Sequence, residues 1–188
     1  MPAISKASKD LSGIATKMLA INGSLDEAAI PHAFGGALAL AWCTQRARGT
    51  IDIDLNVFVS ADHTREVLDA LPREIVWSSA DQELIQRDGQ QRLWWESTPV
   101  DLFINTTEFH VQAGRRTRWE LFEGVELPFL SCSDLAVFKA FFNRTKDWAD
   151  LEEMLAANTL DIDRVIGVLV HYLGPTDERI ERLERLRS

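Results

Sequence analysis

The chain of 188 residues is 46% hydrophobic and 26% charged, an ordinary globular composition that excludes a disordered protein. Acidic residues outnumber basic ones by 29 to 20, and this net charge of −9 argues against general binding to nucleic-acid phosphates while allowing a local basic patch. No stretch approaches the roughly 18 apolar residues of a membrane span, and the N-terminus lacks an apolar signal segment, so we expect a cytoplasmic protein without membrane contact.

Helix and strand patterns alternate from the N-terminus onward. Apolar residues recur three or four apart over 5–21, which predicts a helix. Residues 51–59 begin with strict apolar and polar alternation, which predicts a strand with one apolar face. The other elements predicted in this part are an extended run at 31–34, helices at 36–45 and 61–71, strands at 73–77, 91–96 and 99–104, and a strand pair over 114–127.

The pattern is helical from Ser133 to the end of the chain. Helices are predicted over 133–143, 147–157, 161–173 and 176–187. We therefore expect an α/β (α+β) core in residues 1–130, followed by a helical region in residues 131–188 that packs on this core.

The two cysteines, Cys43 and Cys132, could form at most one bridge. Their number and spacing give no sign of a disulfide scaffold. Cys43 lies on an apolar predicted helix, and we expect it in the core.

Asp52 and Asp54 are the first candidates for a functional site. Side chains two positions apart on a strand point to the same face, and two carboxylates there would repel each other unless a cation lies between them. Hard divalent ions such as Mg²⁺ take oxygen ligands and suit such a pair. The pattern also fits a strand with a solvated acidic face.

Gly35 and Gly36 lie between an extended run and a predicted helix. Backbone N–H groups at such a pair can approach a phosphate, with the helix N-terminus behind them, although the pair also fits a tight turn. The helix carries the chain about 15 Å from Gly36. The extended residues 47–52 can bring it back, so Asp52 and Asp54 can return beside the glycine pair.

Asp101 offers a third carboxylate, opposite the apolar face of its predicted strand. On a strand next to the first pair, it could complete a two-metal site for phosphoryl transfer. It could also be the general base for an attacking hydroxyl. The alternative is an ordinary exposed aspartate near a strand start.

Taken together, these motifs resemble the nucleotidyltransferase superfamily of the polymerase-beta type: a Gly-Gly pair, the element R-x-T-x-D-I-D-L at residues 48–55, and a later strand aspartate. The segment 133–155 (SDLAVFKAFFNRTKDWADLEEML) is similar to the helix pair of the AbiEii and MenT-like nucleotidyltransferases, known as toxins of toxin–antitoxin and phage-defence systems. The match covers 32–57, 99–104 and 133–155. Many members carry Ser or Thr where this chain has Gly36.

The resemblance implies a polymerase-beta-like core with a mixed sheet. It also implies Mg²⁺- or Mn²⁺-dependent transfer of a nucleoside monophosphate from an NTP, with release of pyrophosphate. Several MenT-like members use the tRNA 3′ end as acceptor, so RNA and a cognate antitoxin protein are the expected partners. A protein or small-molecule acceptor is an alternative, and so is a non-catalytic binding module that acts as antitoxin or regulator.

The predicted site residues fall into three groups. Metal binding is assigned to Asp52, Asp54 and Asp101. Catalysis is assigned to these three with Lys139 and Asp147. Nucleotide contacts are assigned to Gly35, Gly36, Arg48, Thr50, Lys139, Lys146 and Asp150.

Lys139 is surrounded in the sequence by apolar residues, so its helix should be largely buried. A buried lysine either extends to water or meets a negative partner. That partner is a bound triphosphate or an aspartate of the next helix. Asp147 and Asp150 share a helix face, and they equally fit pairing with Arg144 or Lys146.

Arg115, Arg116 and Arg118 form the densest basic cluster, and Trp119 follows them. With the Trp94–Trp95 pair, this cluster is a possible RNA contact in which aromatic rings stack on unpaired bases. A solvated hairpin is the alternative.

Overall fold

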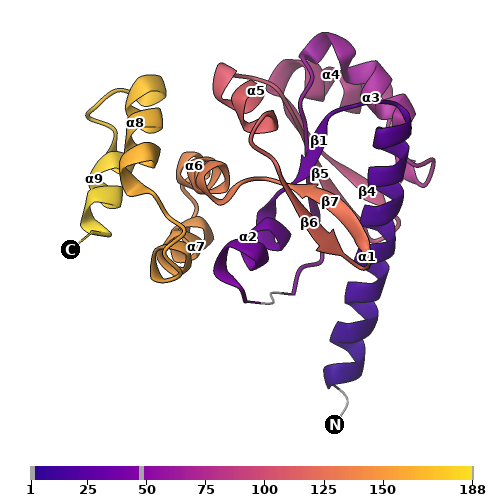
Figure 1. Ribbon diagram of the computed structural model, residues 1–188. Coiled ribbons are helices and arrows are strands. Elements are labelled where there is room, and N and C mark those ends of the chain that lie inside the picture. Colours follow the sequence, from indigo (N-terminus) through magenta and orange to yellow (C-terminus); the bar gives the residue numbers. More distant parts are fainter. Residues whose placement is uncertain (1–2, 47–48, 188) are drawn as a thin grey trace. The chain divides into compact units, whose positions relative to one another are not determined.

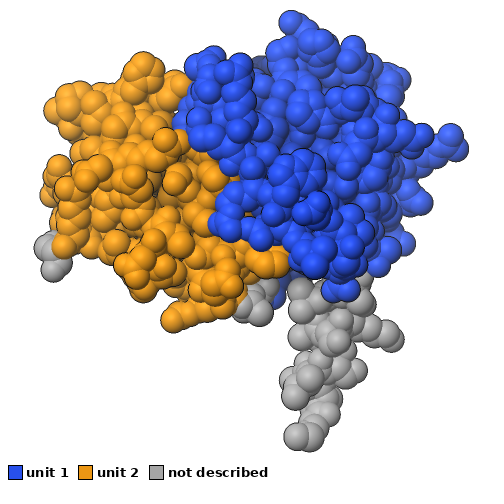
Figure 2. Space-filling view, viewed as in Figure 1, with its two compact units in different colours: residues 1–37, 48–130 blue, residues 38–47, 131–188 orange. Residues whose placement is uncertain are grey.

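The computed structural model describes residues 3–46 and 49–187, with side chains from residue 13 onward. Internal contacts divide the chain into two compact units (Figure 2). The first unit contains Met1–Ala37 and Arg48–Leu130, and the second contains Leu38–Ala47 and Ser131–Ser188.

The first unit is built on a mixed seven-stranded sheet with the strand order β3-β4-β5-β2-β1-β7-β6 (Figure 1). Strand β2 runs parallel to β5, and β1 runs parallel to β7, whereas the other neighbours are antiparallel. The strands are β1 (His32–Phe34), β2 (Ile53–Val57), β3 (Ile75–Val76), β4 (Gln90–Trp95), β5 (Thr98–Ile104), β6 (Arg118–Phe122) and β7 (Val125–Phe129). This arrangement confirms the predicted α/β class with a mixed sheet.

Helix α1 contacts strands from both halves of the sheet. It contacts β7 and α3, and Lys17 donates to the Trp95 carbonyl (3.0 Å) and to Thr98 Oγ1 (2.9 Å) at the β4–β5 turn. The helices of this unit are α1 (Ala3–Glu27), the 3₁₀ turn η1 (Ala61–His63), α3 (Thr64–Ala70), α4 (Ser79–Asp88) and α5 (Glu108–Gly114).

The core of the sheet comes from alternation along β2 and β5. Ile53, Leu55, Val100 and Leu102 have no exposed surface, and burying each aliphatic side chain contributes about 1.5–3 kcal/mol. The residues between them turn to the opposite face of the sheet. This face carries the aspartates of β2 and β5.

The second unit is helical. It takes α2 (Gly36–Thr44) from Leu38 onward together with α6 (Cys132–Phe142), α7 (Thr145–Ala156), α8 (Ile162–Leu173) and α9 (Glu178–Arg185). Trp148 lies in its core, where the indole Nε1 donates to Asn143 Oδ1 (2.7 Å) and the Arg182 guanidinium lies 4.2 Å from the ring centroid.

A disulfide between Cys43 and Cys132 ties α2 to α6 within the second unit. Both residues are buried, as expected for Cys43. The bridge itself was not signalled by the spacing, because 89 positions separate the two cysteines and only the fold brings them together.

Several predicted boundaries are wrong. Helix α1 continues to Glu27, six residues beyond its predicted end, and the helix predicted at 61–71 divides into η1 and α3. The strand pair begins at Arg118, because the residues before it end helix α5. Helix α4 was not predicted, since Ile85 is its one buried residue and its apolar pattern is weak.

The ends of α4 are nevertheless marked in the sequence. Ser78 Oγ accepts a hydrogen bond from the Asp81 N–H, and the Asp81 carboxylate accepts one from the Ser78 N–H, which forms a capping box. Gly89 ends the helix in the left-handed region (φ +74°).

None of the helices in the described ranges is long and apolar enough to cross a lipid bilayer.

Candidate active site

Two of the predicted carboxylates are neighbours on the central strands. Asp54 of β2 and Asp101 of β5 are register partners on parallel strands, so both side chains leave the same face of the sheet. Both are half-buried, between fully buried apolar residues. Asp52 lies directly before β2, two positions from Asp54. The fold therefore places two of the three acids side by side on neighbouring strands and the third directly before one of these strands.

The glycine pair lies beside Asp54. The Gly35 N–H donates to the Asp54 carbonyl (2.8 Å), which holds the turn after β1 against the start of β2. Gly36 has φ +54°, and a side-chain carbon there would lie 1.7 Å from Asp54 Oδ2. The positive φ favours glycine at position 36, and a residue with a side chain would have to displace the Asp54 carboxylate. The turn that starts α2 and the Asp54 carboxylate form one site.

Thr50 holds the third acid in place. Its hydroxyl donates to Asp52 Oδ1 (2.5 Å), and the Asp52 N–H lies 3.3 Å from Thr50 Oγ1. The structure thus gives Thr50 a local role in orienting Asp52. Arg48, predicted to contact the nucleotide, lies outside the described residues.

Arg92 is a site residue that the sequence analysis missed. It stands opposite Asp101 on the antiparallel strand β4, and its Nε and Nη2 donate to the two oxygens of Asp101, each at 2.7 Å. These hydrogen bonds raise the pKa of Arg92, burial opposes the rise, and the charges of Asp101, Asp52 and Asp54 add to it. One guanidinium therefore lies within the field of all three acids.

The carboxylates of Asp52 and Asp54 are of the type that Mg²⁺ prefers as ligands. Among the residues that the structure describes, no group of three or more His, Cys, Asp or Glu is arranged to hold a metal ion. Mg²⁺ is commonly bound by one or two carboxylates together with substrate phosphates and water. Asp52 and Asp54 supply two such carboxylates, while Asp101 is oriented by Arg92.

The second unit contains the other predicted residues. Lys139 Nζ donates to Asp150 Oδ2 (2.5 Å) and lies 3.9 Å from Asp147 Oδ1. The side chains of Lys139 and Asp150 are 8% and 7% exposed, and that of Asp147 has no exposed surface. Lys139 therefore meets an aspartate of the next helix, which was one of its two expected partners.

Asp147 is bound by Arg144 of the preceding turn. Arg144 Nε donates to Asp147 Oδ2 (2.7 Å) and Nη2 donates to Oδ1 (3.1 Å). Lys146 is exposed on α7. Asp147 therefore pairs with Arg144, and Asp150 pairs with Lys139, which also lies within ion-pair distance of Asp147.

The basic cluster is spread over several local contacts. Arg115 is exposed at the end of α5, Arg116 lies 5.9 Å from the Phe109 ring centroid, and Arg118 on β6 pairs with Glu120. Trp94 and Trp95 lie on β4, and the sheet order places β5, β2, β1 and β7 between them and β6. The fold thus separates this tryptophan pair from the arginines.

Two solved structures share this fold. One is the solution structure of the antibiotic-resistance factor ANT(2'')-Ia, with 13% identity, 94% of this chain and 97% of that chain covered, and a TM-score of 0.56. The other is the crystal structure of ANT(2'')-Ia in complex with adenylyl-2''-tobramycin, with 12% identity, coverage of 94% and 99%, and a TM-score of 0.59. No protein-family model and no curated protein matches the chain. The likeness shows a nucleotidyltransferase fold.

Proposed function

We propose that this protein is a nucleotidyltransferase that moves a nucleoside monophosphate from an NTP to an acceptor and releases pyrophosphate. The observation that carries the proposal is the position of Asp54, which lies against the Gly36 turn and in register with Asp101. A phosphate-binding turn and paired carboxylates at one place are what such a transfer requires. The nucleotidyltransferase fold supports the same reaction.

Asp52 and Asp54 would hold Mg²⁺ or Mn²⁺, which would neutralise charge on the triphosphate and polarise the phosphorus under attack. The backbone N–H groups at Gly36 and the start of α2 would bind triphosphate oxygens, while the Gly35 N–H holds the turn against β2 through the Asp54 carbonyl. Thr50 would keep the Asp52 carboxylate in position through its hydroxyl.

Asp101 is the residue we propose as general base. It would accept the proton of the acceptor hydroxyl as that oxygen attacks the α-phosphorus and the bond to pyrophosphate breaks. Arg92 would act as a positioning residue, since its two hydrogen bonds fix the plane of the Asp101 carboxylate.

In the second unit, we propose that the exposed Lys146 contacts the nucleotide phosphates. The buried pair of Lys139 and Asp150 would hold α6 against α7 and so fix Lys146 and the neighbouring Asp147. The resemblance to the AbiEii and MenT-like enzymes assigns phosphate contact to Lys139 as well. Such contact would require Lys139 to exchange Asp150 for a phosphate oxygen.

For the acceptor, we propose the tRNA 3′ end, with the protein acting as the toxin of a toxin–antitoxin pair in the cytoplasm. The similarity of segment 133–155 to that family supports this role, and Arg115 with its exposed side chain is a candidate RNA contact. The net charge of −9 is unfavourable for RNA binding.

A small molecule with a hydroxyl group is the second candidate acceptor. Support for it comes from the ANT(2'')-Ia structures, one of which contains adenylyl-2''-tobramycin, and which match this chain over nearly its full length. The two candidates share the transfer site and differ only in the group that attacks.

The deciding experiment incubates the purified protein with Mg²⁺, total tRNA and each labelled NTP in turn, with tobramycin in a parallel reaction. We expect label in tRNA with the wild type and none with Asp52→Ala or Asp54→Ala. Label in tobramycin alone would select the small-molecule acceptor. Undiminished transfer by either variant would overturn the metal assignment, and absence of NTP binding would overturn the enzyme itself.

The toxin role has a separate test in cells. Expression of the wild type should arrest growth, and Asp54→Ala should relieve the arrest at equal protein levels. Arrest that persists with Asp54→Ala would exclude a catalytic toxin. Absence of arrest, combined with stable binding of a partner protein, would favour a non-catalytic antitoxin or regulator.

A further inference from the structure

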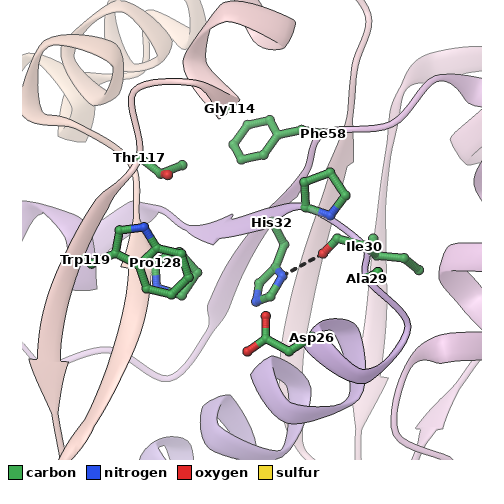
Figure 3. Close-up of a pocket in the computed structure, with 10 residues that line it drawn as sticks. Asp26, Ala29, Ile30, His32, Phe58, Gly114, Thr117, Trp119 and Pro128 are labelled. Carbon is green, nitrogen blue, oxygen red and sulfur yellow. Dashed lines mark hydrogen bonds between the residues drawn. The ribbon is translucent and has the colours of Figure 1, made fainter.

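A cavity of about 290 Å³ opens in the first unit at the start of β1 (Figure 3). Its walls come from the end of α1, the start of β1, the end of β2 and the β6–β7 pair. Gly35 and Asp54 lie at the opposite end of β1, since His32 pairs with Val57 and Phe34 pairs with Leu55. The cavity is therefore separate from the site of the proposed reaction.

Aromatic and proline rings form the apolar part of the cavity. Figure 3 shows Phe58 on one side and Trp119 beside Pro128 on another. Trp119 and Pro128 are register partners on β6 and β7, and the tryptophan is 57% exposed. A large ring left this open at the wall of a cavity provides a stacking surface.

The position of Phe58 is fixed by its neighbours. A side-chain carbon at Gly114 would lie 2.5 Å from Phe58 Cγ, so the absence of a side chain at that position allows the ring to pack there. The His110 ring meets Phe58 edge-on, with centroids 5.8 Å apart. Packing therefore fixes the Phe58 wall of the cavity.

Asp26 supplies the charge. Its Oδ2 accepts a hydrogen bond from Asn22 Nδ2 (2.7 Å), and within residues 13–46 and 49–187 no lysine or arginine pairs with it. None of the described residues that line the cavity is a lysine or arginine. The Asp26 carboxylate can therefore accept further hydrogen bonds or an ion pair from a ligand.

His32 lies beside Asp26 in the wall of the cavity. Its Nδ1 lies 3.0 Å from the Ile30 carbonyl oxygen, and its Nε2 lies 3.1 Å from Asn22 Oδ1. Burial lowers the pKa of His32 below its ordinary value, although the hydrogen bond to Ile30 and the charge of Asp26 oppose this. The cavity therefore combines one carboxylate with aromatic faces, and its described lining contains no lysine or arginine.

We propose that this cavity binds a small organic cation, an ammonium group attached to an apolar or aromatic body. The ammonium would pair with Asp26, and the body would stack between Trp119 and Phe58. A cation over an indole face gains electrostatic attraction from the ring as well. The cavity volume suits a ligand with a single ring. The inference does not rest on the proposed nucleotidyl transfer.

The test titrates the full chain with benzyltrimethylammonium and follows the indole N–H signal of Trp119 by NMR, assigned with Trp119→Leu. Phenylacetate and benzyl alcohol serve as anionic and neutral probes of similar size. We expect saturable binding of the cation, with both other probes at least about tenfold weaker. Equal binding of phenylacetate, or absence of a saturable shift, would overturn the proposal.

Two pairs of variants locate the site. Asp26→Asn should weaken cation binding about tenfold, whereas Glu27→Gln, which removes the adjacent exposed acid outside the cavity, should not. Trp119→Leu should also weaken binding, measured by calorimetry, whereas Trp94→Leu on the distant strand β4 should not. Wild-type affinity in both Asp26→Asn and Trp119→Leu would place the binding elsewhere and refute the assignment.

Discussion

The Asp54 carboxylate and Gly36 are in such close contact that no other residue fits at position 36 without moving the acid. Many of the nucleotidyltransferases that the sequence resembles carry Ser or Thr at this position. A hydroxyl side chain would occupy the space that Asp54 Oδ2 fills here. In this chain the Asp54 carboxylate oxygen lies where the side chain of residue 36 would begin.

Gly36→Ala should abolish nucleotide binding and destabilise the protein. The new carbon would have to displace Asp54, and the backbone at φ +54° adds strain of about 1 kcal/mol for a residue other than glycine. Gly124→Ala is the matched control, because Gly124 has φ +82° with nothing within 4 Å of the added carbon. In urea unfolding, Gly124→Ala should lower the free energy of unfolding only by the backbone strain, and the variant should keep full nucleotide affinity. Equal effects of the two substitutions would show that contact with Asp54 does not matter.

Arg92→Lys should slow the proposed transfer by about tenfold while changing the KM for NTP less than twofold. Lysine keeps the charge but loses the two parallel hydrogen bonds that orient Asp101. The pair is partly exposed, so the free energy of unfolding should change by less than about 1 kcal/mol. Arg65→Lys, in an exposed pair with Asp69, controls for the substitution itself. A changed KM with an unchanged kcat would contradict the positioning role.

Lys139→Met should lower the free energy of unfolding by about 3–5 kcal/mol, because the buried Asp150 would lose its ion pair with Lys139. The double variant Lys139→Met/Asp150→Leu should recover most of this loss, since an apolar pair of similar volume replaces the ions. Urea unfolding measures both, with the exposed Lys146→Met as control. A double variant as unstable as the single one would show that the pair is not the cause.

The stability of the protein should fall in mild acid because of His110. Burial lowers the pKa of His110 to about 4, although a hydrogen bond to the Ile104 carbonyl opposes this. In the unfolded chain a histidine titrates near 6.5. Between these values the unfolded state binds the proton that the folded state does not, so the free energy of unfolding decreases as the pH falls from about 6.5 toward 4.

The full loss in the free energy of unfolding that His110 causes between neutral and acid pH is about 3 kcal/mol. Urea unfolding at pH 7, 5.5 and 4.5 measures it. His110→Asn should flatten the dependence, and His171→Asn at an exposed position of α8 should leave it unchanged. His32, whose pKa is lowered in the same direction, should account for part of the slope that remains. Identical slopes for wild type and His110→Asn would refute this explanation.

The sheet could be predicted where burial imposes alternation. Ile53 and Leu55 in β2, and Val100 and Leu102 in β5, mark these strands because a half-buried strand needs apolar residues on one face. Helix α5 has no such signal, since its seven residues are too few to show a helical period. For α4 the capping residues Ser78 and Asp81 and the terminal Gly89 were the available signal, and apolar periodicity alone could not detect it.

The pairing of Arg92 with Asp101 was missed because the turn between their two strands was predicted one residue away from its actual position. Strands β4 and β5 are joined by the two residues Glu96 and Ser97, and counting equal steps from that turn places Arg92 opposite Asp101. The predicted strands at 91–96 and 99–104 put the turn one residue too late. The register between β2 and β5 could not be found in this way, because a long connection separates them and no turn fixes their alignment.

The bridge between Cys43 and Cys132 has a practical consequence for handling the protein. Every peptide bond between these residues lies within a covalently closed ring of the chain. A protease that cuts once there, for example at the β4–β5 turn, leaves two fragments that remain joined. Such nicked protein should run as a single band on a denaturing gel until a reductant separates the fragments, so purity judged without reductant would overstate how much intact chain is present.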